Sequence, residues 1–436
     1  MDERNPNNQT SGQERPRRRK NPRQIFKEKY LPFIILGVAG LLILSFIFGS
    51  ISLHRNQKDS QASADRITQL LKDEADDLKA RSAIMAAEYD YENAMKLLAG
   101  YSGGLSTHPE LMALYNQYKD ALAEMVVWDD LSQIPNLSFR TLVADLQKAV
   151  SDPDRGSRYA KRHITTDEFS RILEQLYENG YVLVSLYDFA APVTAADGSV
   201  GVNRTGIRLP EGKKPIIITQ EGVNYYSHTE KCGGFADRLI VNESGSLTCV
   251  LGDQEGAFDL VPVLNAFLAE HPDFSYEGAR ATIAVCGYEG LFGMPLDEIN
   301  AIKAVADKLR TQGYDIACYT YADMEYADFG ATGVQEDLTK WSEKITPILG
   351  QTDILVYPTG GDITGHDSYS GAKYDVLHNA GFRYFVGVEN GVTWGITVSE
   401  YARQTRTLVT AEYLASHPEW YADLFDATAV LSAERG

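Results

Sequence analysis

The fold is decided by three successive segments, RATIAVCGYEG (Arg280–Gly290), LDEINAIKAVADKLRTQGY (Leu296–Tyr314) and DIACYTY (Asp315–Tyr321). The first and the last contain short apolar runs, which are typical of strands buried on both faces. The middle segment has apolar residues at helical spacing, which predicts an amphipathic helix. A strand, a helix and a second strand in this order predict a parallel pair of strands.

The same alternation continues on both sides of these segments. The further elements that we expect are the helix Ile164–Tyr181, the strands VLVSLYDFA and PIIIT (Pro215–Thr219), the helix Gln335–Leu349, the strand ILVYPTGG (Ile354–Gly361), the helix AKYDVLHNAGF and the strand RYFVGV (Arg383–Val388). This pattern predicts either a parallel sheet with helices on both faces or a closed β/α barrel, and it does not separate the two. The region after Val388 has mixed polarity and no assigned element.

A polar insert from Asn224 to about Tyr276 interrupts this alternation. It contains RLIVNESGSLTCVLGD (Arg238–Asp253), in which two β-like runs flank a turn, so we expect a hairpin. Cys232 and Cys249 flank this hairpin and could form a disulfide, whereas the other two cysteines end apolar runs and are expected to be buried thiols. The chain has no CxxC motif and no Cys/His spacing for a zinc-cysteine site.

The amino-terminal region carries signals of membrane insertion. Residues 1–30 hold nine Lys and Arg against four Asp and Glu, and Leu31–Leu53 contains no charged residue. A helix of this length spans the hydrocarbon core, and the preceding positive charge is expected to stay in the cytoplasm. We therefore expect one transmembrane helix over 31–53, with the rest of the chain outside the cell membrane. The alternative is a cleaved signal peptide, but the apolar run is long for one.

Residues 54–130 have apolar residues at helical spacing and predict a helical stalk that ends in a hairpin. The stalk is either a spacer or a docking site for a protein partner. The complete chain has a formal net charge of -19, with 41 Lys and Arg against 60 Asp and Glu. A nucleic-acid-binding function is therefore not expected, because phosphates require a basic face.

Several segments of residues 131–436 together resemble one known family. They are ITTDEFSRILEQLYENGYVLVSLYDFA, LPEGKKPIIIT, VNYYSH, GFADRLIVNESG, DLVPVLNAFLAEHPDFSYEGARATIAVCGYEG, ILVYPTGGDI, AGFRYFVGV and DLFDATAV. In this order they resemble the polysaccharide deacetylase (NodB-homology) family, and within it a membrane-anchored Gram-positive subgroup. The resemblance implies a distorted β/α barrel with its site at the carboxyl ends of the strands.

The resemblance also implies a chemistry. Members of this family remove acetyl groups from N-acetylated sugars with a divalent metal, often zinc, which polarises the amide carbonyl and activates water. An Asp-Asp pair after the first catalytic strand supplies the general base and one metal ligand. A His-x-x-x-His pair supplies the other two metal ligands.

This sequence departs from the family at each of these points. In ITQEGVNYY, Glu221 stands at the position of the base and Gly222 at that of the metal-binding Asp. In CYTYADMEY, Tyr319 and Asp323 stand at the positions of the two metal-binding His, and Arg140 stands where relatives carry a further His. We therefore expect no metal cofactor, and a deacetylase-like domain that has lost its catalytic chemistry.

Seven residues remain as candidates for a site. Glu221 is the candidate base, with an ordinary ion-paired residue at the end of a strand as the alternative. The candidate ligand-binding residues, which could equally be packing or loop residues, are Tyr225, Tyr226, Tyr319, Asp323, Asp362 and His366. The carboxylates Glu221, Asp323 and Asp362, together with His366, could also converge into an oxygen-rich metal site.

We expect a membrane-anchored extracellular protein that binds cell-wall or capsular polysaccharide, such as peptidoglycan, or a protein partner without turnover. The alternative is an active or repurposed carbohydrate deacetylase or hydrolase acting on N-acetylated polysaccharide through Glu221, with zinc as its cofactor. The two hypotheses differ in the effect expected of Glu221→Gln: an enzyme must lose turnover, whereas a binding protein need only change its affinity.

Overall fold

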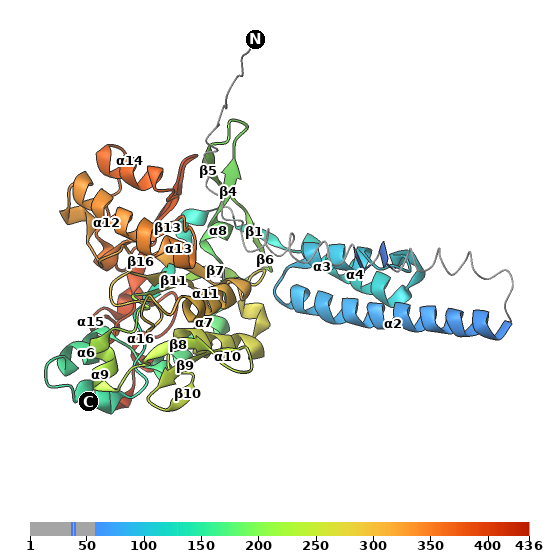
Figure 1. Ribbon diagram of the computed structural model, residues 1–436, viewed down its shortest axis with the longest axis horizontal. Helices are drawn as coiled ribbons and strands as arrows, with labels where there is room; N and C mark the ends of the chain where they lie inside the picture. Colours follow the sequence, from blue (N-terminus) through green and yellow to red (C-terminus); the bar gives the residue numbers. More distant parts are fainter. Residues whose placement is uncertain (1–35, 38, 41–56, 129, 436) are drawn as a thin grey trace, which may run out of the picture.

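The computed structural model describes residues 36–37, 39–40, 57–128 and 130–435 (Figure 1). The expected cytoplasmic tail 1–30 lies outside the described residues, and so does nearly all of the expected transmembrane helix 31–53. Within the part of the chain that the structure describes, no helix is both long enough and apolar enough to cross a membrane.

Seven parallel strands form a closed barrel at the centre of the molecule (Figure 1). Going round the ring, they are β2 (Asn136–Phe139), β7 (Lys214–Glu221), β11 (Thr282–Val285), β12 (Asp315–Cys318), β13 (Ile354–Val356), β14 (Tyr384–Val388) and β16 (Ala402–Leu408). Strand β11 pairs with β12 on one side and β7 on the other, and β16 pairs with β2, so the ring has no open edge. This confirms the predicted β/α barrel and decides against the open sheet.

The two faces of each strand are both buried, which explains the apolar runs in the sequence. Ile217, Ala284, Ala317 and Val386 belong to a core cluster inside the barrel. Their neighbours in sequence point outward and pack against the helices in a second, larger cluster. Because side chains alternate along a strand, one strand supplies both cores.

Helices surround the barrel and connect its strands (Figure 1). They are α5 (Leu146–Val150), α6 (Gly156–Arg162), α7 (Thr166–Glu178), α11 (Ile299–Thr311), α12 (Ala331–Lys344), α13 (Thr346–Leu349), α14 (Ala372–Asn379), α15 (Ala411–Ser416) and α16 (Ala427–Val430). Helix α7 begins with a capping box, in which the Thr165 hydroxyl accepts from the Glu168 N–H and the Glu168 carboxylate accepts from the Thr165 N–H.

Residues 224–276 form a small unit beside the barrel. Its strands β8 (Arg238–Val241), β9 (Leu247–Leu251) and β10 (Gln254–Gly256) make an antiparallel sheet, in which β8 and β9 are the hairpin. Helix α9 (Ser227–Cys232) precedes this sheet and α10 (Leu260–Glu270) follows it. The thiols of Cys232 and Cys249 are both free, so the suggested disulfide is not formed.

Several short strands lie outside the seven-stranded ring. They are β1 (Val126–Trp128), which pairs with β6 (Ile207–Leu209), β3 (Tyr181–Leu183), which pairs with β7, β4 (Ala190–Thr194), which pairs with β5 (Val200–Arg204), and β15 (Gly395–Thr397), which pairs with β16. The short helix α8 (Leu186–Phe189) connects β3 to β4.

The stalk extends from one end of the barrel (Figure 1). It consists of α2 (Gln57–Ala87), α3 (Tyr91–Ala99) and α4 (Pro109–Ala123), which share their own hydrophobic cluster. The stalk is attached through Glu88, whose carboxylate lies 3.3 Å from the Arg280 guanidinium and whose carbonyl accepts from the Glu277 N–H. The stalk has its own core and joins the barrel at several further contacts, in which Tyr89 packs into the barrel's cluster and β1 pairs with β6.

Candidate functional site

The candidate site lies inside the mouth of the barrel, at the carboxyl ends of the strands. Alternation along β2, β7 and β16 turns Ser138, Glu221 and Arg406 inward at this level. A polar layer lies one step deeper, where the Asn136 side chain accepts from Thr219 Oγ1 and donates to Gln404. Polar residues therefore replace the apolar barrel core toward the mouth, where β/α barrels place their sites.

Glu221 is held by two arginines. Its Oε2 lies 2.7 Å from Arg406 Nη2, and its Oε1 accepts from Arg140 Nε at 3.2 Å. The Ser138 hydroxyl is 3.4 Å from Oε2. Glu221 is 2% exposed and Arg140 22% exposed, so only Arg140 reaches toward solvent. Both carboxylate oxygens are therefore engaged within the protein.

Arg406 is buried completely and is the residue that the sequence analysis missed. Besides Glu221, its guanidinium donates to the carbonyls of Val386 and Tyr357, each at 2.8 Å, and to Ser138 Oγ at 3.2 Å. It thereby ties together the ends of four strands. The alternation of Gln404 and Arg406 in the sequence could have indicated a strand with polar side chains on one face. The sequence analysis assigned no element to this region.

These contacts determine the charge state of Glu221. Burial alone would raise the pKa of this carboxyl, but the guanidinium groups of Arg406 and Arg140 outweigh burial and hold the pKa below its ordinary value. An efficient general base has a pKa near the working pH and a free lone pair. Glu221 has neither, so its structural role as the anion of a buried ion pair outweighs the candidate role as a base.

Tyr319, Asp323 and Tyr226 surround this ion pair. Tyr319 follows β12 and is buried, and its hydroxyl accepts from the Thr359 N–H at 3.3 Å. The Tyr226 hydroxyl lies 3.3 Å from the sulfur of Cys286. Burial raises the pKa of Tyr226, and the charge of Asp323 adds to the shift, which places the two side chains in the same part of the mouth. The structure therefore brings together four of the candidate residues.

Asp323 is the carboxylate at the surface of the mouth. Partial enclosure by neighbouring loops raises its pKa to about 6, with a contribution from the charge of Glu221, while Arg140 acts in the opposite direction. The side chain itself is exposed. Water therefore screens the charge of Asp323 in part from the charges of Glu221 and Arg140.

The residues of the mouth do not fit the metal that the family resemblance implies. Gly222 has no ligand atom, and burial raises the pKa of Tyr319 well above its ordinary value, so its phenol stays protonated. The guanidinium groups of Arg140 and Arg406 have no lone pair for a metal and would repel a divalent cation. Among the described residues, no group of three or more His, Cys, Asp or Glu is placed to hold a metal ion.

Three candidate residues lie apart from this cluster. The Tyr225 hydroxyl is turned into the core and donates to Asp259 at 2.7 Å. Asp362 is ion-paired with Arg403 at 2.9 Å, and His366 bonds to Glu389 at 2.6 Å and stacks on Trp394. The suggested oxygen-rich metal site is therefore not assembled, because Asp362 and His366 have partners of their own.

The loops around the mouth contain strained backbone. Eight non-glycine residues of the described chain have positive φ, and six of them follow the carboxyl ends of β7, β11, β12 and β13: Tyr225, Glu289, Phe292, Thr320, Asp323 and Thr359. Positive φ is costly for β-branched threonines in particular. Such strain concentrates at functional sites, so its position supports the mouth as the site of function.

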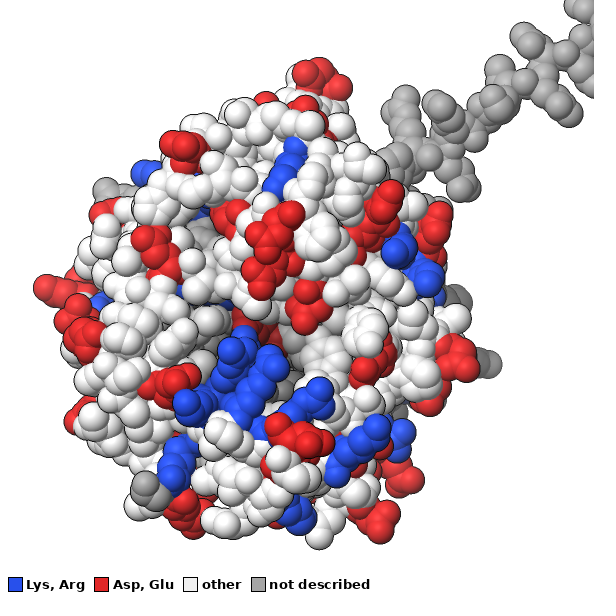
Figure 2. All heavy atoms as spheres, turned by 90° about the vertical axis from the view of Figure 1, so that its left-hand side faces the viewer, with Lys and Arg blue, Asp and Glu red and all other residues white. Residues whose placement is uncertain are grey.

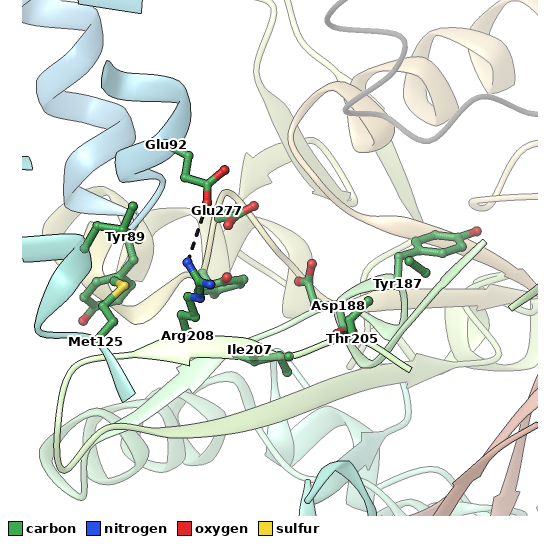
Figure 3. A pocket seen from close by; sticks show the side chains of 13 residues that line it. Tyr89, Glu92, Met125, Tyr187, Asp188, Thr205, Ile207, Arg208 and Glu277 are labelled. Carbon is green, nitrogen blue, oxygen red and sulfur yellow. Dashed lines mark hydrogen bonds and ion pairs between the residues drawn. The ribbon is translucent and has the colours of Figure 1, made fainter. Parts of the chain in front are cut away.

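A separate cavity of about 320 Å³ lies between the stalk and the barrel (Figure 3). Tyr89, Glu92 and Met125 line it from the stalk side, and Arg208 lines it from β6. The Glu92 and Arg208 side chains form an ion pair across it at 3.7 Å. The cavity lies where the stalk meets the barrel, which is typical of a gap left by imperfect packing between two parts. None of the candidate site residues lines it.

The chain has few detectable relatives. No protein-family model matches the sequence, and no curated protein matches it. Among the solved structures similar to it are two deacetylases. The Streptococcus pyogenes deacetylase PplD, solved in complex with acetate, is 12% identical to this chain. The match covers 66% of this chain and 93% of PplD, with a TM-score of 0.34. The BpsB deacetylase domain from Bordetella bronchiseptica is 14% identical, and its match covers 65% of this chain and 97% of that domain, with a TM-score of 0.33. Because both scores are below 0.5, the likeness carries no argument about activity.

Proposed function

We propose that this chain is a membrane-anchored extracellular protein whose barrel mouth binds a cell-wall or capsular glycan without turnover. The observation that carries this proposal is the ion pair of Glu221 with Arg140 and Arg406. Hydrolysis of an acetamide requires an activated water and a polarised carbonyl. In this mouth the one carboxylate at the position of the base is neutralised. Of the three metal-ligand positions, Gly222 has no ligand atom and Tyr319 stays protonated, so Asp323 is left as a single carboxylate.

The remaining groups of the mouth suit recognition of a polar ligand. Arg140 presents the exposed part of its guanidinium, Asp323 presents a carboxylate, and Tyr226 presents a half-buried ring and hydroxyl. Sites for small polar ligands combine a few such polar groups with aromatic surface. Sugar hydroxyls can bond to the charged groups, while the apolar face of a sugar ring can pack on the tyrosine. The family resemblance of the sequence supplies the glycan as the ligand class.

Calorimetric titration of the full-length chain in detergent tests this proposal. The ligands are N-acetylglucosamine oligomers and soluble peptidoglycan fragments. We expect saturable binding that Asp323→Asn weakens about tenfold, the loss of one hydrogen bond to a charged group. The matched control is Glu92→Gln, which removes a carboxylate at the far end of the barrel and should leave binding unchanged. Absence of binding to every glycan would contradict the proposal.

A second candidate function is a repurposed hydrolase in which Asp323 is the base and Arg140 polarises the carbonyl. The raised pKa of Asp323 favours this candidate, because a carboxylate with a pKa of about 6 is a better base than an ordinary one. The two candidates are distinguished by Asp323→Asn. A hydrolase would lose turnover with ligand affinity retained, whereas a binding protein would lose affinity and show no turnover in either form.

A further inference from the structure

Three arginines lie together beside the mouth of the barrel. Arg155 caps helix α6, and Arg158 and Arg162 follow at spacings of three and four residues, so the three side chains share one face of the helix. All three are exposed. Lys161 points elsewhere, since its ammonium pairs with Glu412 at 3.5 Å. The helix thus presents three arginines toward the mouth. We call Arg155, Arg158 and Arg162 the arginine patch.

The helix that carries the patch is held firmly. Tyr159, which lies beside Arg155 and Arg162 on the helix, is buried, and its hydroxyl donates to the His228 carbonyl at 3.0 Å. Its ring packs edge-on against Phe235, with centroids 5.0 Å apart. The arginine patch therefore projects from a fixed base, which reduces the conformational entropy that binding a ligand would cost.

The charges of the patch face one another and the mouth. The pKa of Arg158 is lowered, first by partial burial and then by the positive charges of Arg162, Arg140 and Arg155. The helix reaches the mouth through a stack of rings: Tyr159 stacks on His228 with centroids 6.2 Å apart, and His228 stacks on Tyr226 at 5.5 Å. Arg158 also acts on the carboxyl of Asp323. Carboxylates lie nearby, and Asp152 accepts from the Arg155 backbone N–H. Within the described residues, however, none of the three patch arginines forms an ion pair with another side chain.

The surface view shows how charge is distributed on the side of the barrel away from the stalk. In Figure 2, Lys and Arg side chains gather along one edge of a hollow near the centre of this face with an acidic side chain among them, and further acidic side chains lie on the opposite side. Helix α6 is on the side of the barrel away from the stalk (Figure 1). Since the expected membrane anchor precedes the stalk, the patch faces away from the expected membrane, which argues against a lipid surface as its ligand.

We propose that the arginine patch, continued inward by Arg140, binds an anionic group of the glycan held in the barrel mouth. A guanidinium matches the two oxygens of a carboxylate or phosphate with two parallel hydrogen bonds, so both groups share the required chemistry. The proposal rests on the proposed glycan-binding function and specifies its ligand class as an acidic polysaccharide.

The test is a calorimetric titration of the full-length chain with four probes. They are a neutral N-acetylglucosamine oligomer, polygalacturonate as the carboxylated glycan, phosphomannan as the phosphorylated glycan, and inorganic pyrophosphate. We expect at least one acidic glycan to bind about tenfold or more tightly than the neutral oligomer at low salt. We expect Arg158→Gln combined with Arg162→Gln to abolish this preference, and Lys161→Gln, which removes a charge from the same helix, to retain it.

Each outcome separates this inference from the proposed function. Equal binding of neutral and acidic glycans, unchanged in the double variant, would overturn the anionic ligand and leave the glycan-binding function intact. Binding of pyrophosphate that depends on Arg158 and Arg162, without binding of any glycan, would support an anion site and overturn the glycan. No binding of any probe would overturn both. The thermal unfolding midpoint of each variant, compared with the unmodified chain, verifies that the fold is retained.

Discussion

At the scale of single residues, the buried ion pair of Arg406 and Glu221 governs both stability and chemistry. Arg406→Met leaves a buried carboxylate with one partner and two backbone carbonyls without their donor. Removing one partner of a buried ion pair costs about 3–5 kcal/mol of unfolding free energy. We expect this loss in urea-induced unfolding, and we expect Glu221→Leu with Arg406→Met to cost less than the sum of the single changes.

The control for this prediction is an exposed ion pair of similar composition. Arg208 and Glu92 lie 3.7 Å apart, and their side chains are 50% and 57% exposed. Because solvent screens such pairs, Arg208→Met should cost less than about 1 kcal/mol. A cost for Arg406→Met no greater than that of Arg208→Met would show that the buried pair is not the anchor described here.

Asp323 gives a prediction about pH. Its pKa is raised in the folded protein, so the folded state holds a proton that the unfolded state releases. Between about pH 4 and about pH 6, this group therefore lowers the unfolding free energy as pH rises. We expect Asp323→Asn to remove this part of the slope, measured as the difference between the two stability curves. A carboxyl NMR titration of Asp323 with a midpoint at or below its ordinary value would contradict the prediction.

Individual residues were predicted from sequence to different degrees. The motif positions indicated that Glu221, Tyr319 and Asp323 lie together, and the structure places them in one cluster. The sequence could not show that two arginines neutralise Glu221, since Arg406 lies 185 positions away and its inward direction depends on the register of β16. Tyr225 was misplaced for a related reason, because a positive φ turns its side chain from the mouth into the core.

At the scale of secondary-structure elements, helix α7 shows how local sequence signals determine an end. Thr165 and Glu168 satisfy each other's backbone N–H groups at its first turn. We expect Thr165→Ala to lower the unfolding free energy by about 1 kcal/mol, measured by urea denaturation. Ser157→Ala, an exposed position in α6, is the control and should change stability much less. Equal effects of the two changes would contradict the capping role.

Five barrel strands, β7, β11, β12, β13 and β14, were predictable as elements because both of their faces are buried and they appear in the sequence as apolar runs. Strands β2 and β16 were not, because NLSF turns Asn136 and Ser138, and ARQTRTL turns Gln404 and Arg406, into the polar interior of the mouth. The short strands β1, β4, β5 and β6 were missed as well. They form two-stranded pairs in loops, where few buried side chains leave a pattern in the sequence.

At the scale of the whole molecule, the contact of Glu88 with Arg280 is one of several contacts that hold the stalk on the barrel. The two side chains are 19% and 15% exposed, so solvent screens the pair only partly. We expect Glu88→Ala to cost about 1 to 2 kcal/mol and to speed hydrogen exchange in residues 84–92, with the exchange of the barrel strands unchanged. Glu92→Ala, at the more exposed pair, is the control. Unchanged exchange in residues 84–92 would show that the other contacts hold the stalk without this ion pair.

The closed ring could not be deduced from periodicity alone, since an open sheet gives the same alternation of strands and helices. Closure depends on the pairing of β11 with β7, two strands separated by the whole insert. The barrel in turn places Arg140, Glu221 and Arg406, from three strands, around one point. That placement is the basis of the central claim, that the mouth recognises a ligand and does not hydrolyse it.

The measurement that tests this claim most directly is acetate release by the full-length chain from N-acetylglucosamine oligomers and peptidoglycan. Zinc and cobalt are added in turn, and an active polysaccharide deacetylase is measured beside it. The account predicts no acetate above the protein-free blank with either metal, while the active enzyme releases it. Metal-dependent acetate release by this chain would contradict the account, because it would require a metal and a free base where the structure places two guanidinium groups and a neutralised carboxylate.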